Sequence, residues 1–322
     1  MPYDIDRHAQ HITTAVESNG AAYSSIVASW RRCMFSYGLD PGENASARRS
    51  LSGTELREAR QRLEPLLYTA EPTLNRLRTA LPSMGCSIII ADLDGVSVHW
   101  SGNDTEREDA RRLGLSSGID WSERHEGTNG IGTCLVEKQA LSVREKDHFL
   151  ARDTELSCSV APIFDHQGQM TAALDLAYFG NASSEALIGL LAYSAREAAY
   201  QIEAANFVNV FSDSRIIAVS DHVRACAGLL AVDEDDVVIG ATRMARSLLG
   251  ITDNALRNGI SAMDLRTDTA NLDDTIARAE RGTIRRALVR TGRNVSASAK
   301  ALNISRATIK RKMKQHNLHR LD

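Results

Sequence analysis

Short apolar runs separated by turn residues predict a β-sheet in the middle of the chain. An apolar run over residues 86–91 is followed by Asp94-Gly95, a hairpin turn signal, and the chain returns over residues 96–100. Further strands are expected over residues 140–143, 156–164 and 169–178, and helices over residues 51–81, 105–113, 128–137 and 183–209. Antiparallel strands with helices between them predict an α+β fold.

The C-terminal part of the chain follows a different pattern, that of three short helices. Apolar residues recur at helical spacing over residues 273–291, and they are Ile276, Ala279, Ile284, Ala287 and Leu288. Gly292 suits the position that ends this helix. A second helix is expected over residues 295–302, with Asn294 or Ser296 as its N-cap.

The third of these helices has one apolar and one basic face. Ser305 is expected to cap a helix over residues 306–316. The apolar residues of the last two helices are expected to form a small core, and they are Ala299, Leu302, Ile309 and Met313. The opposite side and its flanks carry Arg306, Ala307, Thr308, Lys310, Arg311 and Lys314.

The positive charge of the chain is concentrated in this C-terminal part. Residues 281–322 hold 12 of the 38 Lys and Arg residues and one of the 41 Asp and Glu residues, so they carry a formal charge of +11 while the remainder carries −14. A helix that is anchored by one face and basic on the other suits the DNA major groove. Arg bridges guanine edges, while Lys and hydroxyl groups at the helix start hold phosphates. The alternatives are a solvated terminal helix and a membrane-surface helix, and the narrow apolar face disfavours the latter.

The run GRNVSASAKALNISRATIKRKMKQHNL resembles the Fis-type helix-turn-helix at the C-terminus of bacterial enhancer-binding regulators, over about residues 275–319. In that family the helix that corresponds to residues 273–291 helps to form a dimer. The resemblance implies a surface at or near DNA made of Ser305, Arg306, Thr308, Lys310, Arg311 and Lys312, to which the basic face adds Lys314. Because one such module binds DNA weakly, we expect a homodimer in which the helix over residues 183–209 pairs with its copy; the alternative is that it packs only on its own domain.

The middle of the chain resembles a GAF domain of the kind found in acetoin-catabolism-type regulators. The runs HEGTNGIGTCLVEK, VREKDHFL, SCSVAPIFD and MTAALDLAYF carry this resemblance, and SWRRCMFSYGLDP over residues 29–41 matches the same regulators. Residues 211–265 resemble the degenerate PAS-like segment that follows. The expected organisation is a helical region over residues 1–82, a GAF sensor over 83–182, a connecting helix over 183–210, the PAS-like segment over 211–265 and the Fis-type module over 273–322.

This sequence departs from those regulators in one respect. They carry an ATPase domain between the sensor and the Fis-type module, whereas only a short segment separates Leu265 from Arg281 here. The sequence contains no GxxxxGK[ST] loop and no GAFTGA-like loop, so ATP hydrolysis and remodelling of the sigma-54 form of RNA polymerase are not expected. The protein is expected to regulate by occupying DNA, and the sequence leaves open whether it contacts RNA polymerase.

A candidate effector site lies at the HEGTNG run, where the chain enters a helix. Thr128 is expected to cap this helix, whose free amides suit an anionic or polar group. The glycines alternatively do no more than permit a tight turn. The resemblance suggests a cavity lined by Trp121, His125, Glu126, Thr128, Asn129, His148 and Phe149, although each of these taken alone is more typical of a structural residue.

Other chemistry has less support in the sequence. The HEGTN run begins like the HExxH of metalloproteases but has Asn where the second His would stand, so no metal site is predicted. The five cysteines lack a CxxC pair, which favours a reducing cytosol over disulfides or zinc sites. Cys86, Cys134 and Cys158 leave open a thiol enzyme similar to GAF-type methionine sulfoxide reductases, and the basic tail leaves open an architectural nucleoid protein.

We therefore expect a homodimeric, ligand-responsive, DNA-binding transcription regulator of the cytoplasm. Its expected partners are double-stranded DNA, a small-molecule effector and a second copy of the chain. No run approaches the roughly 20 apolar residues that a membrane span needs, and the acidic N-terminal stretch is not a secretory signal. No catalytic residue, cofactor or metal is expected.

Overall fold

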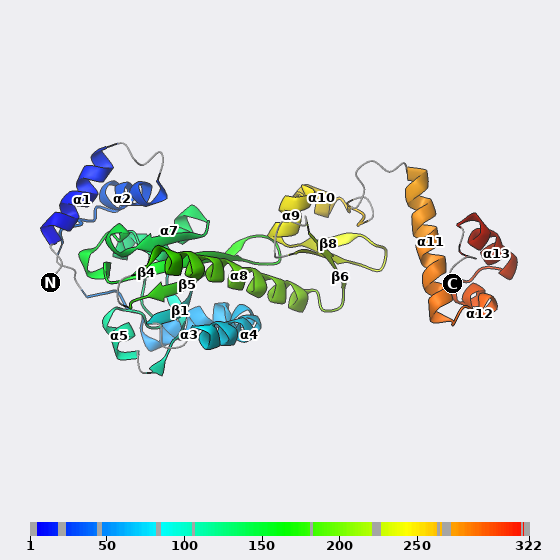
Figure 1. Ribbon diagram of the computed structural model, residues 1–322, viewed down its shortest axis with the longest axis horizontal. Helices are drawn as coiled ribbons and strands as arrows, with labels where there is room; N and C mark the ends of the chain where they lie inside the picture. The colour runs from blue at the N-terminus through cyan, green and yellow to red at the C-terminus, as the bar shows by residue number, and fades with distance from the viewer. Residues whose placement is uncertain are drawn as a thin grey trace. The chain divides into compact units, whose positions relative to one another are not determined.

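The computed structural model describes most of the chain (Figure 1). The described residues are 5–18, 24–43, 47–81, 85–104, 107–180, 183–220, 227–262, 265, 272–316 and 318. Contacts between residues divide the chain into two compact units, residues 1–258 and residues 259–322. Within the described part of the chain, no helix is both long and apolar enough to cross a membrane.

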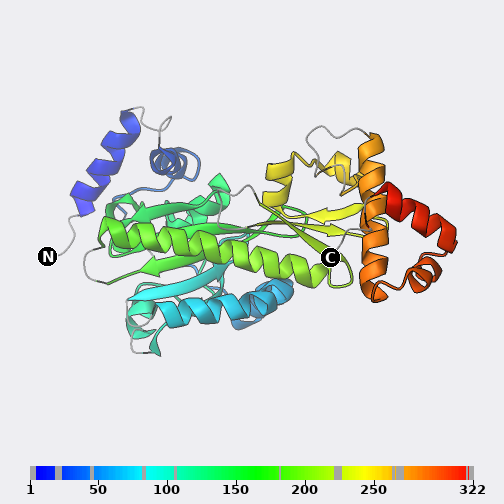
Figure 2. The same ribbon diagram turned by 45° about the vertical axis from the view of Figure 1, so that its right-hand side comes forward.

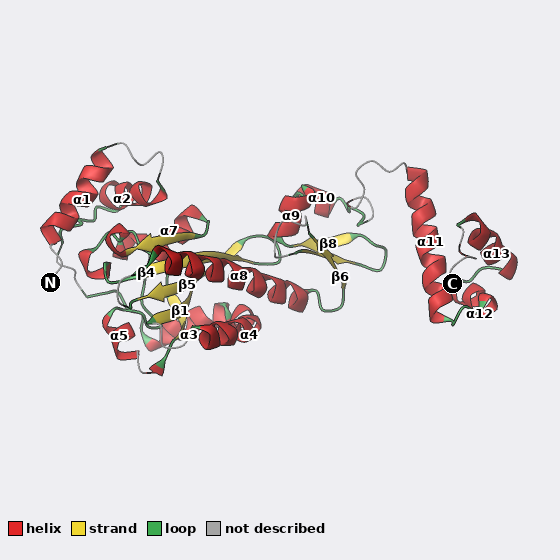
Figure 3. Ribbon diagram, viewed as in Figure 1, coloured by secondary structure: helices red, strands yellow, loops and turns green. Residues whose placement is uncertain are grey.

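The first unit is built around a five-stranded antiparallel sheet in the order β2-β1-β5-β4-β3 (Figure 3). Its strands are β1 (Cys86–Ala91), β2 (Ser97–Ser101), β3 (Leu141–Arg144), β4 (Ser157–Phe164) and β5 (Met170–Tyr178). These strands confirm the ones expected from the apolar runs. The central strands β1, β5 and β4 are largely buried because helices cover both faces of the sheet, which explains why their sequences read as apolar runs without clean alternation.

One face of the sheet packs against two long helices. α4 (Glu64–Ala80) and α8 (Glu185–Val210) lie side by side there, next to α3 (Gly53–Arg62) (Figure 2). The core on this face includes Leu74 of α4, Ile88 of β1, Leu174 of β5, and Leu191 and Ile202 of α8. Burial of this apolar area is what fixes both helices on the sheet.

Shorter elements cover the opposite face. They are α5 (Arg107–Arg112), α6 (Glu123–Glu126) and α7 (Gly130–Glu137), followed by the 3-10 turns η3 (Glu145–Asp147) and η4 (Ala151–Asp153). Ile89 and Val160 of the sheet pack against Ile131 of α7. The N-terminal helices α1 (Ile5–Glu17) and α2 (Ser25–Phe35) pack at the edge formed by α6, α7 and η4.

Beyond α8 the first unit continues into a small second sheet. Its strands β6 (Arg215–Val219), β7 (Gly228–Val232) and β8 (Val238–Ala241) are antiparallel in the order β6-β7-β8. The helices α9 (Arg243–Leu249) and α10 (Asp253–Arg257) follow. The segment thus contains both strands and helices, and its PAS-like identity stays a prediction.

The second unit contains the three helices expected at the C-terminus. They are α11 (Leu272–Arg290), α12 (Val295–Ala301) and α13 (Arg306–Gln315). Gly292 has a φ of +58°, in the left-handed region that favours glycine, and Asn294 rather than Ser296 caps α12. The expected core is confirmed, with Ala299 and Ile309 buried and Leu302 and Met313 packed against them. The side chains of Ile276 and Ala279, expected on the same apolar face, lie outside the described part of the chain.

Candidate functional site

The outer side of α13 presents most of the residues expected at DNA. Arg306, Lys310, Arg311 and Lys314 are exposed. Ile309, on the inner side, is fully buried in the core of the unit. The Ser305 hydroxyl accepts a hydrogen bond from the backbone N–H of Thr308 at 3.0 Å, which caps the helix as expected. One face of this helix is therefore anchored while a basic face stays accessible.

Lys312 occupies a different position from the other basic residues of α13. Its ammonium group forms an ion pair with the carboxylate of Glu280 on α11, and its side chain is 27% exposed. His316 joins the same carboxylate, with Nε2 and Oε2 2.8 Å apart. The sequence placed Lys312 with the DNA surface, but α11 lies alongside α13 and brings Glu280 to it, so the side chain ties two helices together.

The N-terminus of α7 corrects the cap expected from the sequence. Asn129, not Thr128, caps the helix, because its Oδ1 accepts a hydrogen bond from the Gly132 backbone N–H at 2.9 Å. The Asn129 amide also donates to the backbone oxygens of Trp121 and Gly127. The Thr128 hydroxyl points elsewhere and lies 2.7 Å from the hydroxyl of Ser29. A side chain of the protein therefore takes the hydrogen-bonding position at the N-terminus of α7 where an effector was expected.

The glycines of the HEGTNG run allow close packing around α7. A Cβ added at Gly130 would lie 2.5 Å from the Cβ of Cys158 on β4, and one added at Gly127 would lie 2.5 Å from the Cβ of Phe149. Gly127 also has a φ of +64°. These contacts support the alternative in which the glycines permit a tight turn before α7 and allow α7 to pack closely on β4.

Six of the seven residues expected to line an effector cavity form a packed cluster. They are Trp121, Glu126, Thr128, Asn129, His148 and Phe149, and all of them are buried. The Glu126 carboxylate is held by Arg48 and by Arg152, whose Nη2 lies 2.6 Å away. Arg48 also stacks over the Trp121 ring, with its Cζ 4.5 Å from the ring centre. This part of the expected site is filled by the protein's own side chains.

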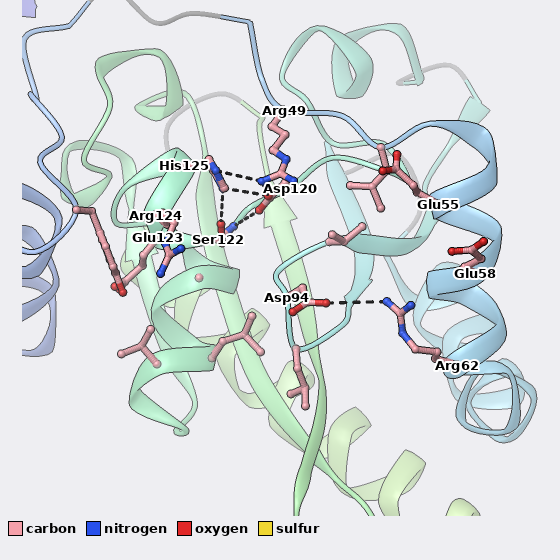
Figure 4. Close-up of a pocket in the computed structure, with 17 residues that line it drawn as sticks. Arg49, Glu55, Glu58, Arg62, Asp94, Asp120, Ser122, Glu123, Arg124 and His125 are labelled. Atoms are coloured by element: carbon pink, nitrogen blue, oxygen red, sulfur yellow. Dashed lines mark hydrogen bonds and ion pairs between the residues drawn. The ribbon is translucent and has the colours of Figure 1, made fainter.

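The seventh residue, His125, lines an open cavity of about 610 Å³. Figure 4 shows His125, Arg49, Asp120 and Ser122 gathered on one wall. The His125 Nδ1 lies 3.0 Å from the Asp120 carboxylate and 3.0 Å from the Ser122 hydroxyl. Its Nε2 lies 3.2 Å from a guanidinium nitrogen of Arg49. The imidazole is therefore held in a defined orientation beside the cavity.

The remaining walls of this cavity carry charges of both signs. Arg62 of α3 faces Asp94 across 3.9 Å, and Arg124 of α6 stacks on Tyr37 with its Cζ 5.9 Å from the ring centre. Glu55 lines the cavity from α3. Guanidinium groups offer fixed donors and carboxylates offer acceptors, so these walls suit a small polar molecule.

Comparison with protein families identifies both parts of the chain. Residues 65–219 match the GAF domain, and residues 275–316 match the bacterial regulatory protein, Fis family. The chain joins a GAF domain to a Fis-family helix-turn-helix. The GAF match begins in α4, runs through the five-stranded sheet and α8, and ends with β6. It therefore confirms the fold expected from the sequence.

Curated relatives are transcriptional regulators. The acetoin catabolism regulatory protein of Cupriavidus necator is 32% identical over 259 residues, which are 76% of this chain and 39% of that protein. The acetoin dehydrogenase operon transcriptional activator of Bacillus subtilis is 26% identical over 201 residues, which are 61% of this chain and 32% of that protein. Each match thus spans less than half of the relative. A chain of the solved Escherichia coli DhaR(N)–DhaL complex is similar in fold, with a TM-score of 0.52 and 19% sequence identity. The match covers 79% of the present chain and 86% of the chain in that complex.

A buried ion pair fastens the N-terminal helices to the GAF domain. The guanidinium group of Arg32 on α2 binds Glu123 of α6 at 2.6 Å and Glu137 of α7 at 3.1 Å. The Glu123 side chain is only 1% exposed, and it also accepts a hydrogen bond from Ser29 at 2.6 Å. Trp30 donates its indole N–H to the Asp147 backbone oxygen at 2.9 Å. These contacts give the SWRRC run a structural role.

Two arginines at this edge of the GAF domain could not be found from the sequence. Arg48 and Arg49 lie far from their partners along the chain, and no local pattern marks them. Arg48 joins Glu126 to the carboxylate of Asp153, while Arg49 reaches Asp120 at 3.7 Å. Only the tertiary fold brings this segment to the cavity.

Proposed function

We propose that this protein is a ligand-responsive transcription regulator that binds double-stranded DNA through α13. The observation that carries this proposal is the exposed basic face of α13, opposite a face anchored by Ile309. Arg306 lies at the start of the helix, where side chains of recognition helices reach base edges. Two curated relatives are named for regulation of acetoin catabolism and of the acetoin dehydrogenase operon, and these names support the same reading.

The proposed effector is a small polar molecule that binds in the cavity beside His125. This cavity has a volume of about 610 Å³, which is within the usual range for small-molecule sites. Two relatives carry acetoin in their names, so a small hydroxyketone is the first compound to test. Tyr37, which follows α2, and Arg124 of α6 both line this cavity. Binding there would bias the packing of the N-terminal helices against the GAF domain.

We propose a homodimer formed through α8. Leu190 and Tyr193 lie on one side of this helix and are 55% and 53% exposed. An apolar pair of this kind on a long helix suits pairing with a second copy. Two linked DNA-binding modules gain effective concentration on a two-part site. Sedimentation of the protein and of Leu190→Glu tests this, and an unchanged mass in the variant would place the dimer contact elsewhere.

Regulation is proposed to occur by occupation of DNA rather than by ATP-driven remodelling of RNA polymerase. The sensor and the helix-turn-helix follow each other with no GxxxxGK[ST] loop in this sequence. We also propose that the protein is not a thiol enzyme. The three candidate thiols, those of Cys86, Cys134 and Cys158, are buried, and burial raises the pKa of the latter two, which disfavours an activated thiolate there.

The test is selection of binding sites from a pool of random duplexes, followed by affinity measurement with and without acetoin. A selected duplex should bind on the order of 1,000-fold more tightly than a scrambled one. Acetoin should change that affinity by about fivefold or more. Equal binding to all duplexes would instead favour an architectural nucleoid protein. If the protein binds a specific duplex but no small polar compound changes its affinity, the proposed DNA binding stands and the proposed effector sensing is wrong.

A further inference from the structure

A second cavity lies where α8 leaves the GAF domain and meets the small sheet. It has a volume of about 280 Å³ and is separate from the cavity beside His125. Its described lining comes from the C-terminal half of α8, from β7 and from the start of α9. The residues used below are Glu197, Tyr200, Glu203, Ala204, Leu229 and Met244.

Glu203 is a buried carboxylate that the protein only partly satisfies. Its side chain is on α8, and the residue is 8% exposed. One oxygen, Oε1, accepts a hydrogen bond from the Phe164 backbone N–H at 2.9 Å. Within the described part of the chain, no group donates to Oε2. Oε2 is not among the fully buried side-chain atoms that lack a partner, so this oxygen stays accessible to a donor from outside the protein.

The guanidinium group whose charge acts on Glu203 contacts an aromatic ring instead. Arg243 of α9 stacks over the ring of Phe164, with its Cζ 4.1 Å from the ring centre. It acts on Glu203 only as a charge at a distance, and burial is the dominant influence on the carboxyl group. Burial raises the pKa of Glu203 to about 7. Glu203 therefore lacks the close cation that most buried carboxylates have.

The described walls around Glu203 are largely apolar, with the neutral polar side chains of Gln201 and Thr242 at the same cavity. Glu197 lines the cavity from the same helix, and no Lys, Arg or His is found among the described lining residues. Tyr200 contributes an aromatic ring, while Leu229 and Met244 contribute aliphatic and thioether surface. An aromatic ring beside a carboxylate is a usual surrounding of an organic ammonium group.

We propose that this cavity is a second ligand site, for a small organic ammonium ion. The ammonium group would donate to the Oε2 of Glu203, and the alkyl part would lie against Tyr200, Leu229 and Met244. An inorganic cation such as Ca²⁺ fits less well, because it needs six or more oxygen ligands and these walls are largely apolar. The site does not depend on the proposed DNA binding or on the cavity beside His125.

The proposal is tested by calorimetric titration of the full chain with n-butylammonium, n-butanol and butyrate. Butylammonium should bind at least about tenfold more tightly than butanol, because only the ammonium group completes the Glu203 carboxylate. Glu203→Gln keeps an acceptor for the Phe164 N–H and should lose about tenfold in affinity for butylammonium. Glu185→Gln, at an α8 position that is 93% exposed, is the matched control and should bind as the unaltered protein does.

A second variant covers the case in which Glu203→Gln does not fold. Ala204→Leu narrows the cavity without changing any charge and should also abolish butylammonium binding. Equal affinities for butylammonium and butanol would overturn the proposal, as would equal losses in Glu203→Gln and Glu185→Gln. Absence of saturable butylammonium binding would overturn it as well.

Discussion

Glu280 of α11 and His316 of α13 are held together, with Oε2 and Nε2 2.8 Å apart. The same carboxylate also binds the ammonium group of Lys312. A negative charge in a DNA-binding module repels phosphates, so its presence needs a compensating role. In this structure that role is to join the recognition helix to the helix behind it.

Replacement of Glu280 by Ala should weaken DNA binding. Electrostatics alone predicts tighter binding, because a negative charge is removed near DNA. Loss of the contacts to Lys312 and His316 should instead loosen α13 and reduce affinity by roughly fivefold, equivalent to about 1 kcal/mol. Fluorescence anisotropy with a selected duplex measures this, and Gln315→Ala is a neutral control on the exposed side. Tighter binding by Glu280→Ala would show that the carboxylate does not position the helix.

Arg306 and Arg311 should behave differently from Lys312. Replacement of Arg306 or Arg311 by Ala should lower the affinity for a selected duplex by about 1–3 kcal/mol if the side chain reads a base. Lys312→Met should act mainly through Glu280, so the double variant Lys312→Met, Glu280→Ala should bind about as well as either single variant. Additive losses in the double variant would place Lys312 at the DNA phosphates.

Gly130 and Gly189 are both helical but should respond in opposite ways to replacement by Ala. A Cβ at Gly130 would lie 2.5 Å from the Cβ of Cys158 and 2.6 Å from the Cγ2 of Val160. Overpacking there should lower the free energy of unfolding by about 1–3 kcal/mol. A Cβ at Gly189 of α8 would have no atom within 4 Å, so Gly189→Ala should raise the free energy of unfolding by roughly 0.5–1 kcal/mol. Urea denaturation checks both, and a stabilised Gly130→Ala would mean that α7 does not pack on β4 in this way.

Asp175 should make the protein less stable as the pH rises. It lies in the centre of the sheet, paired with Ile89 on β1 and Val160 on β4, and its Oδ1 has no partner within the described part of the chain. Burial raises its pKa from the ordinary 3.8 to about 7. The folded protein therefore binds the proton of the Asp175 carboxyl group more tightly than the unfolded chain does. The contribution of this proton to the free energy of unfolding is complete below about pH 4, and it is lost as the pH rises to about 7.

Asp175→Asn removes this titration while preserving the shape of the side chain. Between pH 5 and pH 8 the variant should lose less unfolding free energy than the unaltered protein, by an amount on the order of a few kcal/mol. Denaturation in urea at the two pH values measures the difference. Part of the pH dependence should persist in the variant because burial also raises the pKa of Glu203 to about 7. Parallel pH profiles for the two proteins would show that Asp175 does not titrate in this range.

Arg32→Met should release the N-terminal helices from the GAF domain. It leaves the Glu123 carboxylate, which is 1% exposed, without its main cation. Removing one partner of a fully buried pair costs about 3–5 kcal/mol, and the cost should be smaller here because Arg32 is 23% exposed. Limited proteolysis should then cleave near α2 sooner, while Arg31→Met should not change the pattern. Rescue by Glu123→Gln in the Arg32→Met background would confirm that the unpaired charge causes the effect.

Local patterns were sufficient for much of the second unit. The cap at Ser305 and the glycine after α11 are set by neighbouring residues, so a short stretch of sequence specifies them. The strands of the GAF domain were equally accessible, because a strand covered on both faces must be apolar along its length. The cap of α7 was not, because Thr128 and Asn129 are both good caps and only packing against Ser29 and Trp121 decides between them.

The sequence by itself determined the strands of the five-stranded sheet, the three helices of the second unit and the basic character of α13, because these depend on periodicity and on charge along the chain. It did not determine the break between α3 and α4 or the strands β6, β7 and β8. Only the tertiary structure decided that Lys312 turns toward Glu280, that the residues around Glu126 are packed together, and that Arg49 meets His125 beside an open cavity. The physical reason is that ion pairs and cavities depend on distances between residues remote in sequence. Those distances are set by how apolar faces pack, which no local pattern records.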